Sequence, residues 1–274
     1  MYPFLVLFLV LACLYLFLRL IAFLYSESAS INDDNPYLHP GKKDVLPENM
    51  RLIQIPKKGS RKVGFYELVL KRFLDSVLSF FGLALLGPIF LIISLWIKVD
   101  DPGSVFFVQK RVGKEKTFFA LHKFRTMKTS TPRDMPTHML ANPDVYLTRA
   151  GRFLRKFSLD ELPQIWDIFR GKMSVIGPRP ALWNQADLIA EREKYAANDL
   201  IPGLTGWAQI NGRDELEIVD KAKLDGEYAN NVSLWMDVSC FFGTIKSVAK
   251  SEGVVEGGTG KIAQRDKEVS AEQS

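Results

Sequence analysis

Two long apolar blocks constrain this chain more than any other feature of its sequence. Residues 2–25 contain a single charged residue, Arg19, and residues 76–97 contain none. As a helix, the second block would be about 33 Å long, close to the thickness of the hydrocarbon core of a bilayer. The 47% hydrophobic content alone would fit a soluble protein, but here the apolar residues are concentrated in two places. The sequence therefore predicts a membrane-anchored protein.

The first block has the composition of an uncleaved membrane anchor. No basic residues precede its apolar core and no small-residue cleavage site follows it cleanly, which argues against a secretory signal. Residues 1–25 are therefore expected to anchor the chain, and the polar, aperiodic residues 26–65 to form a linker. Cys13 lies in the anchor and Cys240 in a distant amphipathic segment, so no disulfide is predicted and a reducing, cytosolic location fits.

Basic residues flank the second block: Lys57, Lys58, Arg61, Lys62, Lys71 and Arg72 before it, and Lys98, Lys110, Arg111, Lys114, Lys116, Lys123, Arg125, Lys128 and Arg133 after it. Cations beside a membrane segment mark the cytoplasmic side, so both flanks are expected there. Gly87-Pro88 lies near the midpoint, where proline removes a helical hydrogen bond and favours a kink. Residues 73–97 are therefore predicted to form a re-entrant helix, with a kinked spanning helix as the alternative. Asp75 is expected to pair with Lys71 or Arg72.

After residue 104 the pattern changes to short strands and amphipathic helices. Residues 105–109 and 117–121, separated by a turn at 113–115, predict a β-hairpin whose aromatic side chains pack on the membrane-side core. Helical periodicity returns at residues 162–169, 183–197, 215–228 and 234–248. The apolar face of the last segment fits a helix lying on the bilayer and, equally well, one packed on the domain core. The predicted fold class is α+β, mainly helical, with a short β-hairpin, a re-entrant kinked membrane helix and interfacial amphipathic helices.

Two adjacent carboxylates, Asp160 and Glu161, precede the apolar run 162–169. Adjacent like charges push their pKa values apart, and cations around them in the sequence favour chemistry on an anion. The alternative is structural, because Ser158 and Glu161 have the spacing of a helix capping box. Pro163 makes the start of that helix ambiguous, and a capping box leaves Asp160 unexplained. The surrounding cations are Arg152, Arg155, Lys156, Arg170, Lys172 and Arg179.

Three further segments have features of phosphate or nucleotide binding. In residues 177–180, two prolines restrict the backbone, so Arg179 loses little conformational freedom on forming a two-pronged contact to phosphate. Lys123 and Arg125 would lie on one side of a continued strand, where they suit a diphosphate or, alternatively, anionic lipid headgroups. The glycine-rich residues 201–213 could stack on and read a nucleobase, although a structural loop fits nearly as well.

The sequence predicts magnesium rather than zinc as any bound metal. His39, His122 and His138 have no matching His or Cys cluster, which argues against a zinc site. A hard cation such as Mg²⁺ would be held by carboxylate and phosphate oxygens. Asp100-Asp101 looks like a metal-binding acidic pair, but the Pro-Gly sequence that follows it favours a turn leaving the membrane.

The chain resembles the bacterial sugar transferase family in features that occur in order along the sequence. They are the break at Gly87-Pro88, residues 123–127, 158–164 and 175–180, and Pro202-Gly203-Leu204-Thr205-Gly206. Members are monotopic phosphoglycosyl transferases that begin assembly of capsule, exopolysaccharide, O-antigen and glycoprotein glycans. The resemblance covers residues 66–250, which are expected to form the catalytic domain, including the re-entrant helix 73–97. The polar residues 251–274 are expected to be a disordered tail.

The resemblance implies transfer of a sugar 1-phosphate from a UDP-sugar to undecaprenyl phosphate, with release of UMP. It implies that Asp160 is the nucleophile of a covalent phosphosugar intermediate, and that Glu161 is its partner in metal binding or proton handling. Both carboxylates are expected ligands of Mg²⁺. The expected phosphate contacts are Lys123, Arg125, Arg155, Arg179 and Arg213. The expected location is the bacterial inner membrane, with the catalytic domain facing the cytoplasm.

Other functions remain open from the sequence. A membrane-anchored glycosyltransferase would add the sugar directly and release UDP. A non-enzymatic membrane protein would use its basic faces only for anionic lipids and would tolerate Asp160→Asn. Nucleic-acid binding is not expected, because the cations cluster at the membrane face and around the carboxylates. The sequence does not determine the sugar, the glycan pathway or whether the chain forms a homo-oligomer.

Overall fold

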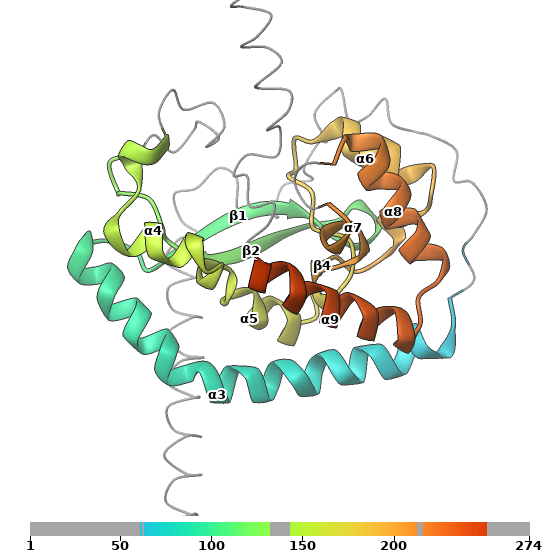
Figure 1. Ribbon diagram of the computed structural model, residues 1–274, viewed down its shortest axis with the longest axis horizontal. Helices are drawn as coiled ribbons and strands as arrows, with labels where there is room; N and C mark the ends of the chain where they lie inside the picture. The colour runs from blue at the N-terminus through green and yellow to red at the C-terminus, as the bar shows by residue number, and fades with distance from the viewer. Residues whose placement is uncertain (1–60, 62, 132–142, 213–215, 251–274) are drawn as a thin grey trace, which may run out of the picture.

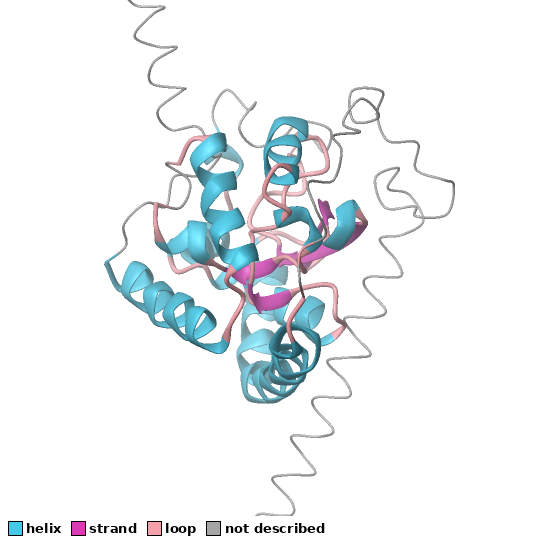
Figure 2. Cartoon of the chain, turned by 90° about the vertical axis from the view of Figure 1, so that its right-hand side faces the viewer, coloured by secondary structure: helices cyan, strands magenta, loops and turns pink. Residues whose placement is uncertain are grey.

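The computed structural model describes residues 61, 63–131, 143–212 and 216–250. The predicted anchor at 1–25, most of the predicted linker and the predicted tail lie outside these residues. The described part is mainly helical with a small amount of sheet, as predicted (Figure 1). Figure 2 shows the strands in the middle of the molecule with helices around them.

Short strands are interspersed among the helices along the chain. The α-helices are α3 (Lys71–Asp100), α4 (Arg149–Lys156), α5 (Gln164–Phe169), α6 (Ala186–Glu193), α7 (Trp207–Ile210), α8 (Ile218–Asn230) and α9 (Leu234–Lys250). A π-helical turn, η1 (Tyr66–Leu70), precedes α3, and the 3-10 turns are η2 (Lys114–Lys116), η4 (Pro143–Tyr146), η5 (Leu159–Glu161) and η6 (Ala197–Asp199). The strands are β1 (Phe106–Val112), β2 (Phe118–Phe124), β3 (Ser174–Ile176) and β4 (Gly203–Thr205).

Together, η1 and α3 form one continuous helix of 35 residues, Tyr66–Asp100. This helix is long enough and apolar enough to cross a membrane. It contains Pro88, and Figure 1 shows the bend expected of an interior proline. One side of α3 is buried against the domain, through residues such as Leu83 and Phe90, which are fully buried. The exposed apolar residues include Phe73, Leu78, Phe81, Leu85, Ile92 and Leu95.

The N-terminal end of α3 is tied to α9 by a buried ion pair. Lys71 Nζ lies 2.6 Å from Asp237 Oδ2. The hydroxyls of Tyr66 and Tyr228 donate hydrogen bonds to the same carboxylate, at 2.7 and 2.6 Å. The carboxylate therefore has three donors, which offsets the cost of burying its charge.

A second carboxylate, Asp75, ties α3 to strand β3. Its side chain is buried, and its Oδ1 accepts a hydrogen bond from the backbone N–H of Val175 at 3.0 Å. The predicted ion pair of Asp75 with a neighbouring cation is wrong. Lys71 reaches Asp237 instead, and Arg72 donates to one backbone carbonyl within α5 and one shortly after it.

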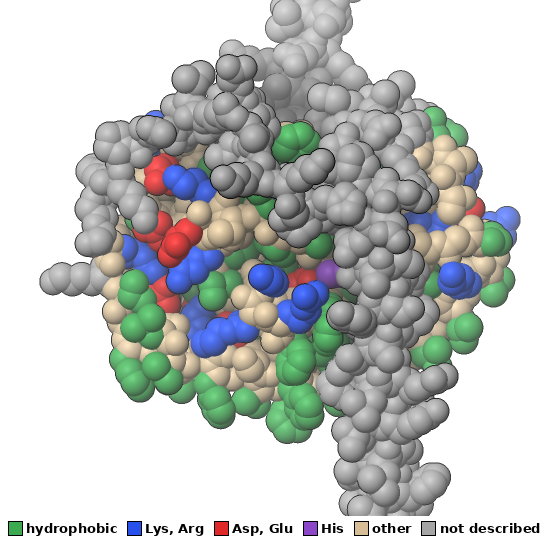
Figure 3. Space-filling view, turned by 180° about the vertical axis from the view of Figure 1, so that it is seen from behind, with side chains coloured by type: hydrophobic (Ala, Val, Ile, Leu, Met, Phe, Trp, Pro, Cys, Tyr) green, Lys and Arg blue, Asp and Glu red, His purple; other side chains and the backbone are tan. Residues whose placement is uncertain are grey.

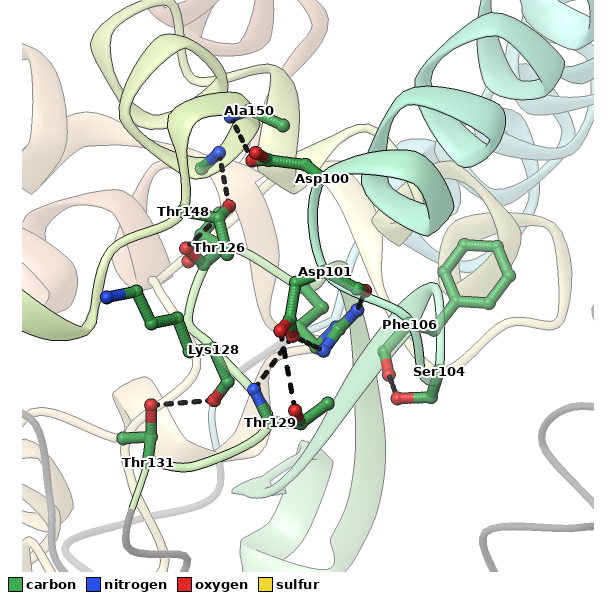
Figure 4. Close-up of polar contacts among 12 residues, drawn as sticks. Asp100, Asp101, Ser104, Phe106, Thr126, Lys128, Thr129, Thr131, Thr148 and Ala150 are labelled. Carbon is green, nitrogen blue, oxygen red and sulfur yellow. Dashed lines mark hydrogen bonds and ion pairs between the residues drawn. The ribbon is translucent and has the colours of Figure 1, made fainter.

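The C-terminal end of α3 is held by two more carboxylates (Figure 4). Asp100 Oδ2 accepts a hydrogen bond from the backbone N–H of Ala150, in the first turn of α4, at 2.8 Å. Asp101 forms an ion pair with Arg125 and accepts a hydrogen bond from the backbone N–H of Thr129 at 2.8 Å. This acidic pair therefore binds protein groups, and both ends of α3 are attached to the same domain.

The predicted hairpin is confirmed. β1 and β2 pair in antiparallel fashion, with Phe106 opposite Phe124, and η2 forms the turn between them. The ring of Phe124 stacks on Phe106 with centroids 5.4 Å apart, and lies 5.3 Å from the ring of Phe90 on α3. Phe106 and Phe124 thus pack on the apolar helix, as expected, whereas Phe107 is exposed and Phe119 packs in a different cluster.

Three features were not predicted, namely the short helices α4 and α7 and the parallel pairing of β3 with β4. Each of these strands has only three residues, too few to give a clear alternating pattern. Beside this pair, the backbones of Gly177 and Gly203 are in close contact, because a Cβ on Gly203 would lie 2.1 Å from Gly177 N. The helix predicted at 183–197 is shorter, and the chain turns at Ala196, which has left-handed backbone geometry.

Gly151→Ala is expected to destabilise the fold. A Cβ at Gly151, in α4, would lie 1.9 Å from the carbonyl oxygen of Thr126, so the backbone would have to move. Overpacking of this kind costs roughly 1–3 kcal/mol. Gly82→Ala is the matched control, because its Cβ would meet only Ile165, at 3.6 Å. Thermal unfolding in detergent should give a lower midpoint for Gly151→Ala alone, and equal midpoints would contradict the close packing of α4.

Candidate active site

Asp160 and Glu161 lie on a single 3-10 turn, η5, between α4 and α5. The turn follows Ser158, whose φ of 55° is left-handed, and Pro163 directly precedes α5. The side chain of Ser158 makes no capping hydrogen bond. The capping-box alternative is therefore wrong, and the carboxylate of Glu161 binds elsewhere.

Glu161 is held between two cations from distant parts of the chain. Lys123 Nζ, on β2, lies 2.8 Å from Glu161 Oε1, and Arg179 Nη2 lies 2.7 Å from the same oxygen. Only 18% of the Glu161 side chain is exposed, so these ion pairs are largely shielded from water. Figure 3 shows basic and acidic side chains gathered on one face, above a lower edge of apolar side chains along α3.

Electrostatics keeps Glu161 ionised. Burial raises the pKa of its carboxyl, but the charges of Arg179 and Lys123 and the hydrogen bonds from both outweigh burial and leave the pKa well below its ordinary value. Glu161 is therefore a poor proton acceptor at neutral pH and acts as a fixed negative charge. Lys123, Arg179 and Arg111 against Glu161 and Asp160 leave this site with a formal charge of +1, which favours an anionic ligand.

Arg111 supports Arg179 and was not predicted as a site residue. From β1, its Nη1 donates to the carbonyl oxygen of Pro180 at 3.0 Å, while its Nη2 donates to Gln109 Oε1 at 2.7 Å. Burial and then the charge of Arg179 lower the pKa of Arg111 to about 9, so it remains protonated at neutral pH. No local sequence pattern identifies this role, because it depends on β1 meeting residues 177–180.

The nucleophile candidate and a third cation lie on or near the same turn. Asp160, adjacent to Glu161 in η5, is partly exposed. Arg155, in the last turn of α4, donates from Nε to Thr126 Oγ1 at 2.9 Å. Arg213, another predicted phosphate contact, lies outside the described residues.

Arg125 has a different environment from Lys123. Its side chain is buried and pairs with Asp101 at the end of α3. Strand β2 ends at Phe124, so the two cations, expected on one side of a continued strand, bind different carboxylates. The structure therefore brings Lys123 and Arg179 together at Glu161 and directs Arg125 elsewhere.

The carboxylates of η5 fit a magnesium ion that is bound together with phosphate. Mg²⁺ commonly uses one or two carboxylates plus phosphate oxygens. Asp160 and Glu161 supply such oxygens, although Glu161 is already engaged by its two cations. Within the described residues, no group of three or more His, Cys, Asp or Glu side chains could hold a metal. His122 instead pairs with Asp167, with Nδ1 2.7 Å from Oδ1.

The ion pairs of Glu161 predict a pH dependence of stability. Because folding lowers its pKa below the ordinary value of 4.5, the stabilisation is present above that pH and is lost as the pH falls below it. Glu161→Gln should therefore have a lower free energy of unfolding than wild type at about pH 7, with a gap that shrinks by about pH 3. Denaturant titrations measure this gap, with the exposed Glu115→Gln as control. A gap independent of pH would contradict it.

Comparison with known proteins places this site in a family. The family model described as bacterial sugar transferase matches residues 66–251. The uncharacterized sugar transferase EpsL of Bacillus subtilis is 37% identical over 187 residues, which are 68% of this chain and 91% of EpsL. The exopolysaccharide production protein ExoY of Rhizobium meliloti is 36% identical over 197 residues, 67% of this chain and 87% of ExoY.

Longer relatives are matched over only part of their length. The UDP-glucose:undecaprenyl-phosphate glucose-1-phosphate transferase of Escherichia coli is 37% identical over 190 residues, which are 65% of this chain and 39% of that protein. Residues 66–251, which the family model matches, contain the helix α3, the hairpin and the carboxylate turn η5. The chain belongs to the bacterial sugar transferase family.

Proposed function

We propose that this chain transfers a sugar 1-phosphate from a UDP-sugar to undecaprenyl phosphate and releases UMP, as the first step of building a glycan such as an exopolysaccharide. The observation that carries the proposal is the cluster in which Lys123 and Arg179 hold Glu161 beside Asp160. It joins a partly exposed carboxylate to cations that suit a diphosphate. The name of the Escherichia coli relative, which describes a glucose-1-phosphate transferase acting on UDP-glucose and undecaprenyl phosphate, supports the proposal.

In the proposed first step Asp160 is the nucleophile. One of its carboxylate oxygens attacks the phosphorus that carries the sugar. A bond forms between this oxygen and the phosphorus, the bond from the phosphorus to the bridging oxygen breaks, and the bridging oxygen leaves with UMP. No proton has to move, because the nucleophile is an anion and UMP leaves as one.

In the second step the lipid phosphate replaces Asp160. A phosphate oxygen of undecaprenyl phosphate attacks the same phosphorus, and the bond to Asp160 breaks and restores the carboxylate. A covalent intermediate allows a water-soluble donor and a membrane-bound acceptor to use one site in turn.

The cations act by binding and orientation. Lys123 and Arg179, and with them Arg155, contact the phosphate oxygens and offset their charge. Glu161 keeps Lys123 and Arg179 in place and limits the repulsion between them before the substrate binds. Asp160 and Glu161 would hold Mg²⁺ together with the substrate, and the ion would supply further positive charge to offset the diphosphate.

We also propose that α3 is re-entrant, with the domain on the cytoplasmic side of the inner membrane. One end is bound through Lys71 and Asp75, and the other through Asp100 and Asp101, all to the same domain. A helix that spanned a bilayer would hold these ends on opposite sides. The bend at Pro88 and the exposed apolar side of α3 fit a helix that dips into one leaflet and returns.

Helix α9 provides a second proposed contact with the membrane. Its Cys240 is fully buried in the domain, so one side of the helix packs on the core. Its exposed large apolar residues are Leu234, Trp235, Phe241, Phe242 and Ile245. A helix with one packed and one exposed apolar side can lie on the bilayer and pack on the domain core at the same time, which are the two positions that its sequence allows.

Asp160→Asn should reduce UMP release from UDP-sugar and undecaprenyl phosphate by a factor on the order of 10³ or more, because it removes the nucleophile. The protein should still partition into membranes. Exposed Asp187→Asn is the matched control and should retain activity. Intact-mass analysis should detect the added phosphosugar on wild type incubated with UDP-sugar alone. The same analysis of Asp160→Asn should detect no added mass.

Three results would contradict the proposed reaction. Near-normal turnover of Asp160→Asn would remove Asp160 as nucleophile. Release of UDP instead of UMP would indicate a glycosyltransferase that adds the sugar directly. A purified chain inactive with a full panel of UDP-sugars, but still bound to anionic lipids, would favour the non-enzymatic alternative.

The re-entrant topology predicts that both ends of α3 are accessible from the cytoplasm. Gly64→Cys and Lys98→Cys, at exposed positions in a background of Cys13→Ser and Cys240→Ala, place one thiol near each end. A membrane-impermeant maleimide should label both thiols in inside-out vesicles and neither in right-side-out vesicles. Labelling of the two thiols from opposite sides would establish a spanning helix.

A further inference from the structure

Helix α4 carries an exposed face that the proposed reaction does not use. Its members are Arg149, Arg152, Phe153, Lys156 and Phe157, the last directly after the helix, and all are exposed. Their spacing of three and four residues places them on one side of the helix. The other side packs on the domain through its buried residues Ala150, Gly151 and Leu154. We call the exposed set the α4 face.

The aromatic part of the α4 face continues the apolar surface of α3. The ring centroid of Phe153 lies 5.3 Å from that of Trp96 on α3 and 4.8 Å from that of Phe157. These three side chains are 44%, 39% and 50% exposed, in the order Phe153, Trp96, Phe157. An exposed aromatic row therefore runs from the proposed membrane helix onto α4.

The basic part of the α4 face is not neutralised by any acidic side chain of the described residues. Arg149, Arg152 and Lys156 form no ion pair with any residue in the described ranges, and α4 contains no acidic residue. Lys156 Nζ lies 5.6 Å from the ring centroid of Phe157, so a cation is placed beside the aromatic row. At the right of Figure 3, the end of the molecule that carries α4, basic and apolar side chains lie side by side.

We propose that the α4 face binds the anionic phospholipid headgroups of the bilayer surface. The inference rests on the proposed function in one respect, namely that α3 enters the membrane. Cations with long side chains reach lipid phosphates while aromatic rings enter the apolar boundary below, which matches the composition of this face. Its unpaired positive charge favours anionic over zwitterionic lipids.

The position of α4 gives this contact a consequence for the site. Helix α4 ends at Lys156, and η5, which carries Asp160, begins at Leu159. Headgroups bound to the α4 face would therefore hold the Asp160 turn at the depth of the acceptor's phosphate.

The test measures lipid binding without turnover. Full-length protein in mild detergent is titrated with phosphatidylglycerol or phosphatidylcholine, and bound lipid is counted by native mass spectrometry with no UDP-sugar present. Wild type should prefer phosphatidylglycerol, and Arg149→Gln/Arg152→Gln/Lys156→Gln should lose this preference by about tenfold or more. The matched control Lys114→Gln/Lys194→Gln/Lys223→Gln removes three half-exposed cations elsewhere and should keep it. Phe153→Ser/Phe157→Ser should weaken binding of both lipids equally.

The outcomes separate this inference from the proposed reaction. The Arg149→Gln/Arg152→Gln/Lys156→Gln variant would overturn the inference if it melted like wild type and still preferred phosphatidylglycerol. Loss of a co-purifying protein from this variant, instead of loss of the lipid preference, would also overturn the inference. A wild type that prefers phosphatidylglycerol but releases no UMP would leave the lipid contact standing and remove the proposed reaction. If Phe153→Ser/Phe157→Ser weakened binding of one lipid more than the other, the result would contradict the assignment of lipid preference to the cations and of general affinity to the aromatic rings.

Discussion

The structure depends on the attachment of both ends of one apolar helix to a single domain through carboxylates. Asp237 and Asp75 are used at the start of α3, and Asp100 and Asp101 at its end. A buried or partly buried carboxylate without donors is costly, so each of these groups favours the one arrangement in which its donor is present. Helix α3 therefore lies along the domain for its whole length, and the hairpin packs on its buried side.

This arrangement places the polar site beside the apolar helix. The hairpin that packs on α3 also supplies Lys123, and α4, which is bound to the end of α3, leads into the turn with Asp160. Arg179 comes from a third segment, which Arg111 supports by hydrogen bonding to the Pro180 carbonyl. Because the cations come from separate elements, the site exists only when the hairpin, α4 and the proline loop are all docked. A charged site beside an apolar surface is what a reaction between a soluble nucleotide and a membrane lipid requires.

The parts of the fold with a regular pattern over many residues were predictable. The long apolar block, its proline bend, the hairpin and the later amphipathic helices follow from periodicity and turn residues. Helix α4 was missed because its eight residues carry four cations and few apolar residues. The β3–β4 pair was missed because it depends on the close approach of Gly177 and Gly203 rather than on alternation. The side chain of Ser158 fits a capping box by spacing, but its left-handed backbone does not permit one.

The sequence by itself determined which segments are apolar, where the helix bends and which carboxylates and cations are candidates for phosphate chemistry, because these properties are local. Only the tertiary structure decided which charges meet. Lys123 and Arg179 reach Glu161, whereas Arg125 reaches Asp101, although all three cations looked alike in the sequence. The physical reason is that a Coulomb interaction depends on distance and burial, and both are set by contacts between residues far apart in the chain.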